Sequence, residues 1–323
     1  MCTAITYSTK DHYFGRNLDL EHSYRTAVTI TPRNHPLHFR RLADQEQHFA
    51  IIGMALVEGN YPLYFDATNE HGLSMAGLNF PGNAVYHPEK NDAYNVTPYE
   101  LIPWILGQCR NVQEARLLLD KANILNIPFS AEYPLSPLHW ILSDSNASVT
   151  IESMSDGLHV FANSVGVLTN NPPFDYHMHN LTNYLNVTSQ EASNRFSEAL
   201  DLHPCSRGAG SIGLPGDLSS PSRFIRAVFT KFNSISKDSE SASVSQFFHI
   251  LDSVAQTQGC AKIGNLYEKT LYSSCCNTTK CIYYYTTYEN RQITGIRMHS
   301  EDLNGNALIS YCLRTDQQFR MDN

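Results

Sequence analysis

The second residue of the chain is a cysteine, and a cysteine at this position can act as a nucleophile that carries its own base. Removal of Met1 would leave Cys2 with both a thiol and a free α-amine. The thiolate is the reactive form, and a thiol with an ordinary pKa of about 8.5 is mostly protonated at neutral pH. An α-amine titrates at about 7.7 to 8.0, so it can accept the thiol proton and return it to a leaving amine. Cys2 is therefore a candidate nucleophile, and a small buried residue at the start of an edge strand is the alternative.

Amide cleavage by a thiol also needs donors for the oxyanion of the tetrahedral intermediate and charged groups that orient the reacting atoms. Two asparagines, Asn79 and Asn170, stand where predicted strands run into turns. Three charged residues complete the candidate set, namely Arg16, Asp19 and Arg223. Each residue alone is weak evidence, because asparagine is common in turns and charged residues are mostly solvated surface groups.

Arg16 and Asp19 can both face the site only if the strand that contains them is not regular. They are three residues apart, so their side chains lie on opposite faces of a regular strand. We therefore expect a bend or strand end near Asn17 if both side chains are to point inward.

The elements that would position these residues are mostly strands. Runs rich in β-branched and aromatic residues, bounded by polar turn residues, predict strands at 4–7, 13–16, 27–31, 49–57, 62–66, 72–78, 148–152, 158–161, 166–169, 270–273, 281–286, 292–296 and 308–311. Capping signals predict helices that begin at Thr97, Asn111 and Ser220, and a further helix is predicted over 243–255. Strands at both ends with helices between them predict one α+β domain over residues 1–323, in which two sheets pack face to face under a cover of helices.

Two segments are predicted to be loops. The stretch 126–137 contains prolines among apolar residues and cannot form a regular helix. Its residues Phe129, Tyr133 and Leu135 could line an apolar pocket, or the loop could simply cross the core. The stretch 205–221 is dense in glycine, serine and proline, and we expect it near the site or at a subunit contact.

Composition excludes several classes of function. The formal net charge is −8 and no basic stripe is present, which argues against nucleic acid or an anionic membrane as the main partner. The sequence contains no run of about 18 apolar residues, the length needed to span a bilayer, and no signal-peptide pattern. A cytoplasmic protein is therefore expected. The eight cysteines are dispersed and expected to be reduced. No cysteine and histidine cluster has the spacing of a metal site, so we expect neither metal nor cofactor.

Five stretches taken together closely resemble the choloylglycine hydrolases, a branch of the N-terminal nucleophile (Ntn) hydrolases that contains the bile salt hydrolases of gut bacteria. They are residues 1–3, 14–19, 69–82, 167–172 and 214–224, and the likeness covers essentially the whole chain. The resemblance implies a four-layer αββα sandwich of two mainly antiparallel sheets, usually assembled as a homotetramer. It also implies cleavage, through a thioester, of the amide that joins a bile acid to glycine or taurine.

Carried over residue by residue, the resemblance makes Cys2 the nucleophile. It makes Arg16 and Asp19 the polar partners that orient Cys2 and its amine. Asn79 and Asn170 match the oxyanion and substrate-holding positions.

The resemblance extends to two further positions, since Arg223 matches the remaining active-site arginine and Leu18 a pocket-lining residue. The related penicillin V acylases share most of this set but typically have tyrosine where Asn79 stands, so Asn79 favours bile salts and penicillin V acylase activity is the alternative. Arg207 is expected to approach the anionic end of the substrate. A non-enzymatic binding scaffold with the same fold is a third hypothesis, which the complete candidate set disfavours.

Overall fold

The computed structural model describes residues 1–323, and its strands form two large antiparallel sheets and one small parallel pair. The order in sheet A is β12 (Val167–Leu168), β1 (Cys2–Ser8), β2 (His12–Leu20), β14 (Leu266–Asn277), β15 (Ile282–Thr287) and β16 (Thr294–Arg297), with β13 (Ala261–Ile263) also paired to β14. The order in sheet B is β11 (Gly157–Ala162), β10 (Ser148–Met154), β9 (Leu138–Ser143), β6 (Ser74–Asn79), β5 (Tyr61–Asn69), β4 (Ile51–Glu58), β3 (Ala27–Thr31) and β17 (Ile309–Cys312). The small pair consists of β7 (Tyr94–Val96) and β8 (Ala122–Ile124).

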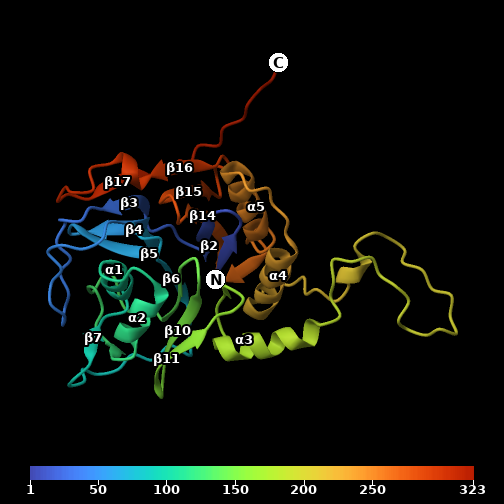
Figure 1. The fold of residues 1–323 in the computed structure, drawn as a ribbon, viewed down its shortest axis with the longest axis horizontal. Coiled ribbons are helices and arrows are strands. Elements are labelled where there is room, and N and C mark those ends of the chain that lie inside the picture. Colours follow the sequence, from blue (N-terminus) through green and yellow to red (C-terminus); the bar gives the residue numbers. More distant parts are fainter.

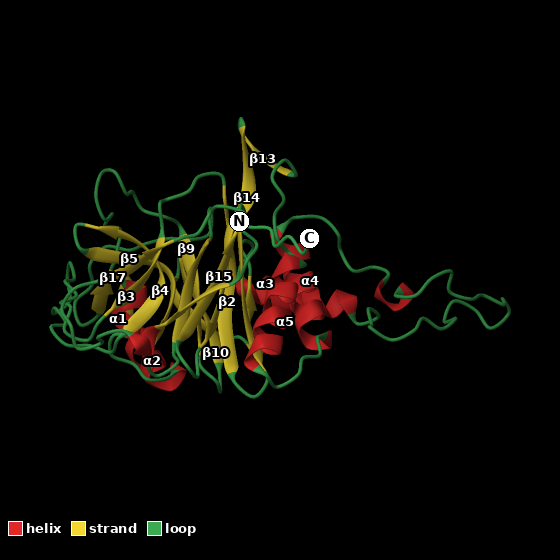
Figure 2. Cartoon of the chain, turned by 90° about the horizontal axis from the view of Figure 1, so that it is seen from above, coloured by secondary structure: helices red, strands yellow, loops and turns green.

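Helices cover the outer face of each sheet (Figures 1 and 2). Sheet A is covered by α4 (Ser220–Asn233) and α5 (Glu240–Asp252), with α3 (Phe174–Leu181) against α4. Sheet B is covered by α1 (Leu101–Leu106) and α2 (Val112–Leu119). Three short 3₁₀ turns are η1 (Thr182–Tyr184), η2 (Ala209–Ser211) and η3 (Met298–Ser300). The layers therefore run helices, sheet, sheet, helices, which confirms the predicted α+β, four-layer αββα sandwich.

Sheet A is buried on both faces where the candidate nucleophile lies. One hydrophobic core joins the inner faces of the two sheets with α4 and α5, and a second lies between sheet B and its helices. A strand covered on both faces reads as a continuous apolar run rather than an alternating one. Residues 2–7 of β1 are accordingly all buried, which holds the start of the chain in place.

Every predicted strand overlaps an observed one, but the ends and some elements differ. The helix expected from Thr97 begins only at Leu101, although Thr97 N does donate to Glu100 Oε2 at 3.0 Å as a capping box requires. The helix expected over 243–255 is Glu240–Asp252, because Ser239 rather than Ser243 caps it. The sequence prediction missed α3 and β9, which directly follow proline-rich stretches.

No helix in this fold has the length and apolar character needed to cross a membrane. Most of the segment 185–218, between η1 and α4, projects away from the four layers (Figures 1 and 2), and its last residues return to α4, where Arg226 Nη1 donates to Pro215 O at 2.9 Å. Several of its apolar side chains are exposed, among them Leu185, Phe196 and Ile212.

Candidate active site

Cys2 begins β1 and is 2% exposed. Neighbouring strands on both sides hold β1, since it pairs with β12 and with β2. Cys2 lies opposite Leu18, and Ala4 lies opposite Arg16. Because directly opposed residues of an antiparallel pair project from the same face, Cys2, Leu18 and Arg16 share one face of sheet A. The structure thus places the pocket candidate Leu18 beside Cys2.

Arg16 is completely buried and points from this face towards sheet B. Its Nη1 donates to Gly77 O at 2.5 Å and to Phe65 O at 3.1 Å, while its Nη2 is buried without a partner. Burial alone would lower the pKa of the guanidinium. Attraction to the acidic groups of Cys2 and Asp66 outweighs this effect of burial, so the pKa is raised. Arg16 therefore supplies a fixed positive charge and an unused donor on the Cys2 side of the sheet.

Asp19 lies on the opposite face of β2 from Arg16. Two residues earlier on that face, Asn17 Nδ2 donates to Leu251 O of α5 at 2.9 Å, so the face looks towards the helices. Asp19 Oδ1 accepts from Thr270 Oγ1 at 2.6 Å, and its Oδ2 is buried without a partner. Burial raises the pKa of this carboxyl, and the positive charge of Arg223 opposes the rise.

The bend expected near Asn17 is absent, since β2 is continuous from His12 to Leu20. Arg16 and Asp19 instead approach Cys2 from the two faces of the same sheet. A bulge in β14 between Thr270 and Tyr272 shifts the register so that Thr270 is opposite Asp19. The irregularity that assembles the site is therefore in the partner strand.

Arg223 connects three segments of the site from the helix side. It is fully buried in the first turns of α4 and donates to Cys2 O at 2.5 Å, Thr3 Oγ1 at 2.7 Å and Asn170 Oδ1 at 2.7 Å. Its Nε donates to Leu218 O at 3.0 Å. Burial lowers the pKa of the guanidinium, but an arginine side chain keeps its charge at neutral pH in a protein.

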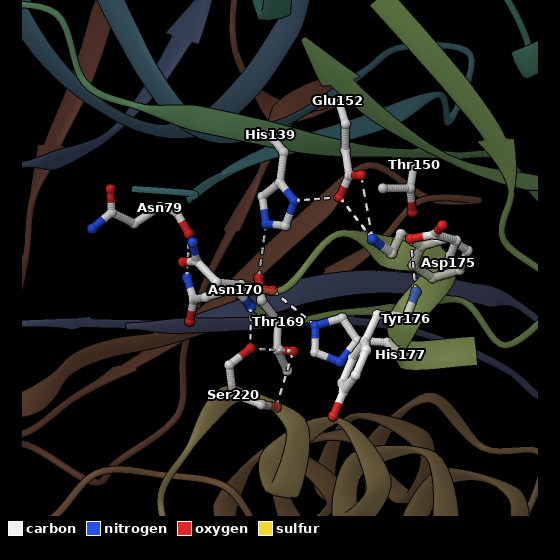
Figure 3. A network of polar contacts seen from close by, with 12 residues as sticks. Asn79, His139, Thr150, Glu152, Thr169, Asn170, Asp175, Tyr176, His177 and Ser220 are labelled. Carbon is white, nitrogen blue, oxygen red and sulfur yellow. Dashed lines mark hydrogen bonds and ion pairs between the residues drawn. The ribbon is translucent and has the colours of Figure 1, made fainter. Parts of the chain in front are cut away.

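The two asparagines meet next to Cys2. Asn170 Oδ1 accepts from Cys2 N at 2.8 Å, and Asn170 Nδ2 donates to the backbone oxygen of Asn79 at 2.7 Å (Figure 3). The side-chain amide of Asn79 makes no hydrogen bond within the chain, and Figure 3 shows it pointing away from Asn170. Asn170 thus fixes the nitrogen of Cys2, and Asn79 has an amide left for a substrate.

Met1 occupies the strand position in front of Cys2. Its amine donates to Asp19 O at 2.7 Å and forms an ion pair with buried Glu268, and its carbonyl accepts from Asp19 N at 3.0 Å. Burial lowers the pKa of this amine. While Met1 is present the nitrogen of Cys2 belongs to a peptide bond, so it cannot act as a base.

The loop residues Phe129, Tyr133 and Leu135 are half-buried, and Phe129 does line a cavity. The ring of Phe129 lies 5.2 Å from that of Tyr99 and 5.9 Å from that of Tyr61, at a cavity of about 400 Å³. Tyr133 packs against Phe129 at 6.2 Å. This cavity is not formed by any of the six candidate catalytic residues.

Arg207 is also separate from the other candidates. It is exposed, lies in the projecting segment 185–218 and makes no hydrogen bond or ion pair (Figure 1). The glycine- and serine-rich stretch 205–221 begins away from the layers, but its end reaches the site, where Leu218 O accepts from Arg223 Nε at 3.0 Å and Ser220 Oγ accepts from Asn170 N at 2.8 Å.

Three buried residues behind Asn170 were missed by the sequence prediction, namely His139, Glu152 and His177. They form the polar network of Figure 3 with the residues around Asn170. In the sequence His139 and Glu152 are polar residues within apolar runs, which does not reveal their partners, and His177 lies in a mixed polar stretch. Elsewhere in the fold, no group of three histidine, cysteine, aspartate or glutamate side chains is arranged to hold a metal ion.

Stability should depend on pH through His177. Burial lowers its pKa to about 4, whereas an unfolded histidine titrates at about 6.5. Between these values the unfolded chain binds a proton that the folded chain does not, so stability is full above pH 6.5 and falls as the pH drops towards 4. The expected loss between pH 7 and pH 4.5 is about 2 kcal/mol. Urea unfolding at pH 7 and pH 4.5 measures it.

His177→Gln is the matched variant, because its amide can still donate to Asn170 O but does not titrate. It should lose about 2 kcal/mol less than the wild type over this pH interval. His12, whose pKa burial also lowers to about 4, is unchanged in the variant and accounts for acid sensitivity that remains. An equal loss in both proteins would show that His177 is not responsible.

The comparisons with known proteins agree with the geometry. Residues 2–311 match the family described as linear amide C–N hydrolases, choloylglycine hydrolase family. A protein of Lactiplantibacillus plantarum named bile salt hydrolase/transferase is 53% identical over 320 residues, which cover 99% of each chain. The crystal structure of the C2A mutant of conjugated bile acid hydrolase from Clostridium perfringens matches with a TM-score of 0.93 and 36% identity, covering 100% of both chains. Penicillin V acylase from Agrobacterium tumefaciens matches with a TM-score of 0.76 and 18% identity over 97% of this chain and 92% of that chain, a likeness of fold alone.

Proposed function

Because the chain belongs to the choloylglycine hydrolase family of linear amide C–N hydrolases, we propose that it hydrolyses glycine- or taurine-conjugated bile salts. The products are the free bile acid and the amino acid. The observation that carries the proposal is the hydrogen bond from Cys2 N to Asn170 Oδ1, with Arg223 bound to both residues. This contact would hold the α-amine of a processed chain beside its own thiol.

The first half of the reaction forms a thioester. In the processed chain the amine of Cys2 takes the thiol proton, and the sulfur attacks the amide carbon. The side-chain amide of Asn79 is available to donate to the oxyanion, and such a donor is effective because it is fixed before the charge develops. The tetrahedral intermediate collapses, the C–N bond breaks, and the amine of Cys2 returns the proton to the leaving glycine or taurine nitrogen.

The second half consumes water. The amine of Cys2 removes a proton from a water molecule, which attacks the thioester carbon, and the C–S bond breaks as the bile acid leaves. We assign Arg16 to attracting the thiolate from the side of sheet B. We assign Asp19, whose free Oδ2 lies on the helix side, to orienting the amine together with Arg223.

A substrate comparison tests the proposal. Glycocholate, taurocholate and penicillin V are supplied at equal concentration to protein whose N-terminal mass has been measured. We expect both bile salts to be hydrolysed, with a kcat/KM at least about tenfold above that for penicillin V, a difference of about 1.4 kcal/mol in transition-state free energy. Preferred cleavage of penicillin V would instead establish the alternative, penicillin V acylase activity.

Asn79→Tyr is the matched variant for this comparison, because tyrosine is the residue that penicillin V acylases typically have at that position. The side chain of Asn79 makes no bond within the chain, so the fold should tolerate the change. The variant should lower the ratio of bile salt to penicillin V hydrolysis. An unchanged ratio would remove Asn79 from the specificity assignment.

We further propose that residues 1–323 form one domain and that four copies assemble in the cytoplasm. The exposed apolar side chains of the projecting segment 185–218 support assembly, since such residues are usually covered by a partner. Arg207 is exposed in this projecting segment, and we propose that it contacts the substrate of a neighbouring copy. Light scattering of the purified protein tests this, and a fully active monomer would contradict both the homotetramer and the role of Arg207.

A further inference from the structure

The turn that carries Asn170 is bonded to three other elements through its backbone. Thr169 O accepts from His139 Nε2 of β9 at 3.0 Å, and Asn170 O accepts from His177 Nε2 of α3 at 2.8 Å. Asn170 N donates to Ser220 Oγ of α4 at 2.8 Å. Figure 3 shows these contacts converging on Thr169 and Asn170 from different sides. The backbone of Asn170 is therefore fixed independently of its side chain.

His139 takes its orientation from Glu152. The two side chains are fully buried, and His139 Nδ1 lies 2.9 Å from Glu152 Oε1. The ring also stacks on Phe80, with centroids 4.2 Å apart and an interplanar angle of 6°. Both carboxylate oxygens of Glu152 accept from Phe174 N, at 3.1 and 3.2 Å. Glu152 thus caps the start of α3, where Pro173 offers no side-chain bond.

The hydrogen-bond partners of His139 determine which ring nitrogen carries a proton. The carbonyl of Thr169 can only accept, so His139 must carry a hydrogen on Nε2. One further proton lies between His139 Nδ1 and the Glu152 carboxyl. Without this proton the lone pair of Nδ1 would face a negatively charged carboxylate oxygen, and the two would repel. In either arrangement the pair is neutral overall, and the donor aimed at Thr169 O is preserved.

We infer that His139, Glu152 and His177 are positioning residues for the amide hydrolysis, acting through Asn170. They hold the Thr169 and Asn170 carbonyls so that Asn170 Oδ1 meets the nitrogen of Cys2. A fully buried acid and histidine contribute little to stability compared with apolar residues of the same volume, which argues for a role in geometry. The inference rests on the proposed function, because it assigns these residues to the same site.

Three variants separate positioning from packing. Glu152→Gln keeps both bonds, since its carbonyl can accept from Phe174 N and its amide can donate to His139 Nδ1. Glu152→Leu removes both bonds. His139→Phe keeps a ring against Phe80 but removes the donor to Thr169 O.

The matched control is His35→Phe. His35 is 1% exposed and its two ring nitrogens bond to backbone oxygens of Asn306 and Asn60, both at 3.1 Å, with no link to Cys2. It reports what the loss of an equally buried histidine does to the fold.

Steady-state kinetics on glycocholate give the first readout. We expect kcat to fall about 10- to 100-fold in Glu152→Leu and His139→Phe, with KM changed less than about threefold, because a misplaced catalytic group slows the chemical step. Glu152→Gln and His35→Phe should keep kcat within about threefold of the wild type. Equal kcat in folded His139→Phe and wild type would overturn the inference, as would equal losses in Glu152→Gln and Glu152→Leu.

Alkylation of Cys2 by iodoacetamide gives a second readout that needs no substrate. Mass spectrometry follows the N-terminal peptide, with the exposed Cys205, Cys260 and Cys312 as internal references. We expect alkylation of Cys2 alone to slow about tenfold in the two disruptive variants. If the wild type hydrolyses no bile salt, the proposed function fails while this readout still decides the positioning role.

His177→Phe covers the case in which His139→Phe does not fold. Its ring can remain against Phe224, which now stacks with His177 at 4.8 Å, but the donor to Asn170 O is lost. The same slowing of Cys2 alkylation is expected. Unchanged alkylation in folded His177→Phe would contradict the inference.

Discussion

Cys2→Ala is expected to reduce kcat for conjugated bile salts at least about 10⁴-fold while the substrate still binds. The reason is that the reaction runs through a bond to Sγ, and the remaining groups can bind or polarise the substrate but cannot form the thioester. The charges around Cys2 stay in place, because Arg223 contacts the backbone oxygen of Cys2 and Arg16 contacts backbone oxygens of sheet B. Product release is measured chromatographically with glycocholate.

Binding is measured on the same variant by the rise in unfolding temperature with glycocholate concentration. Cys276→Ala is the matched control, because Cys276 is also buried in sheet A, at 1% exposure, but has no contact with the site. It should keep full activity. Hydrolysis by Cys2→Ala within tenfold of the wild type would exclude the thioester mechanism. If the wild type bound glycocholate but did not hydrolyse it, the hypothesis of a non-enzymatic binding scaffold would be supported instead.

The sheet that positions Cys2 could be predicted because its signal is local. Residues 4–7, 13–16 and 270–273 are apolar or β-branched runs, and they form neighbouring strands in sheet A. Continuous apolar runs also indicate cover on both faces, which is what residues 2–7 show. The order of the strands could not be obtained this way, since β14 inserts beside β2 from the other end of the chain.

The contacts within the site could not be predicted from local patterns. Arg223 reaches Cys2 across 221 positions, and Asn170 reaches it across 168. Only the resemblance to a family suggested that these residues belong together. Asp19 illustrates why local patterns are not sufficient. A bulge in β14 places Thr270 opposite Asp19, and nothing in the sequence of β2 indicates this bulge.

The paths of the loops could not be predicted from composition for a related reason. Prolines correctly excluded a helix over 126–137, but composition does not say which surface a loop follows. Phe129 packs with Tyr61 and Tyr99, and Arg207 leaves the layers with its projecting segment. A loop's chemistry can be read from its residues, whereas its destination depends on contacts with the rest of the fold.

A chain that retains an extension before Cys2 is expected to lose about 10²- to 10⁴-fold in kcat, because this is what general-base catalysis contributes. With Met1 present the nitrogen of Cys2 is an amide, and Met1 itself fills the strand position beside Asp19. The test is a chain with a short N-terminal extension that a protease removes directly before Cys2. Intact mass identifies the form, and glycocholate hydrolysis is measured before and after cleavage.

Cleavage should restore activity in the same sample, which rules out misfolding as the cause of the loss. Cys2→Ala with the same extension is the control, because its activity should stay low after cleavage. Full activity of the uncleaved chain would show that another group accepts the thiol proton.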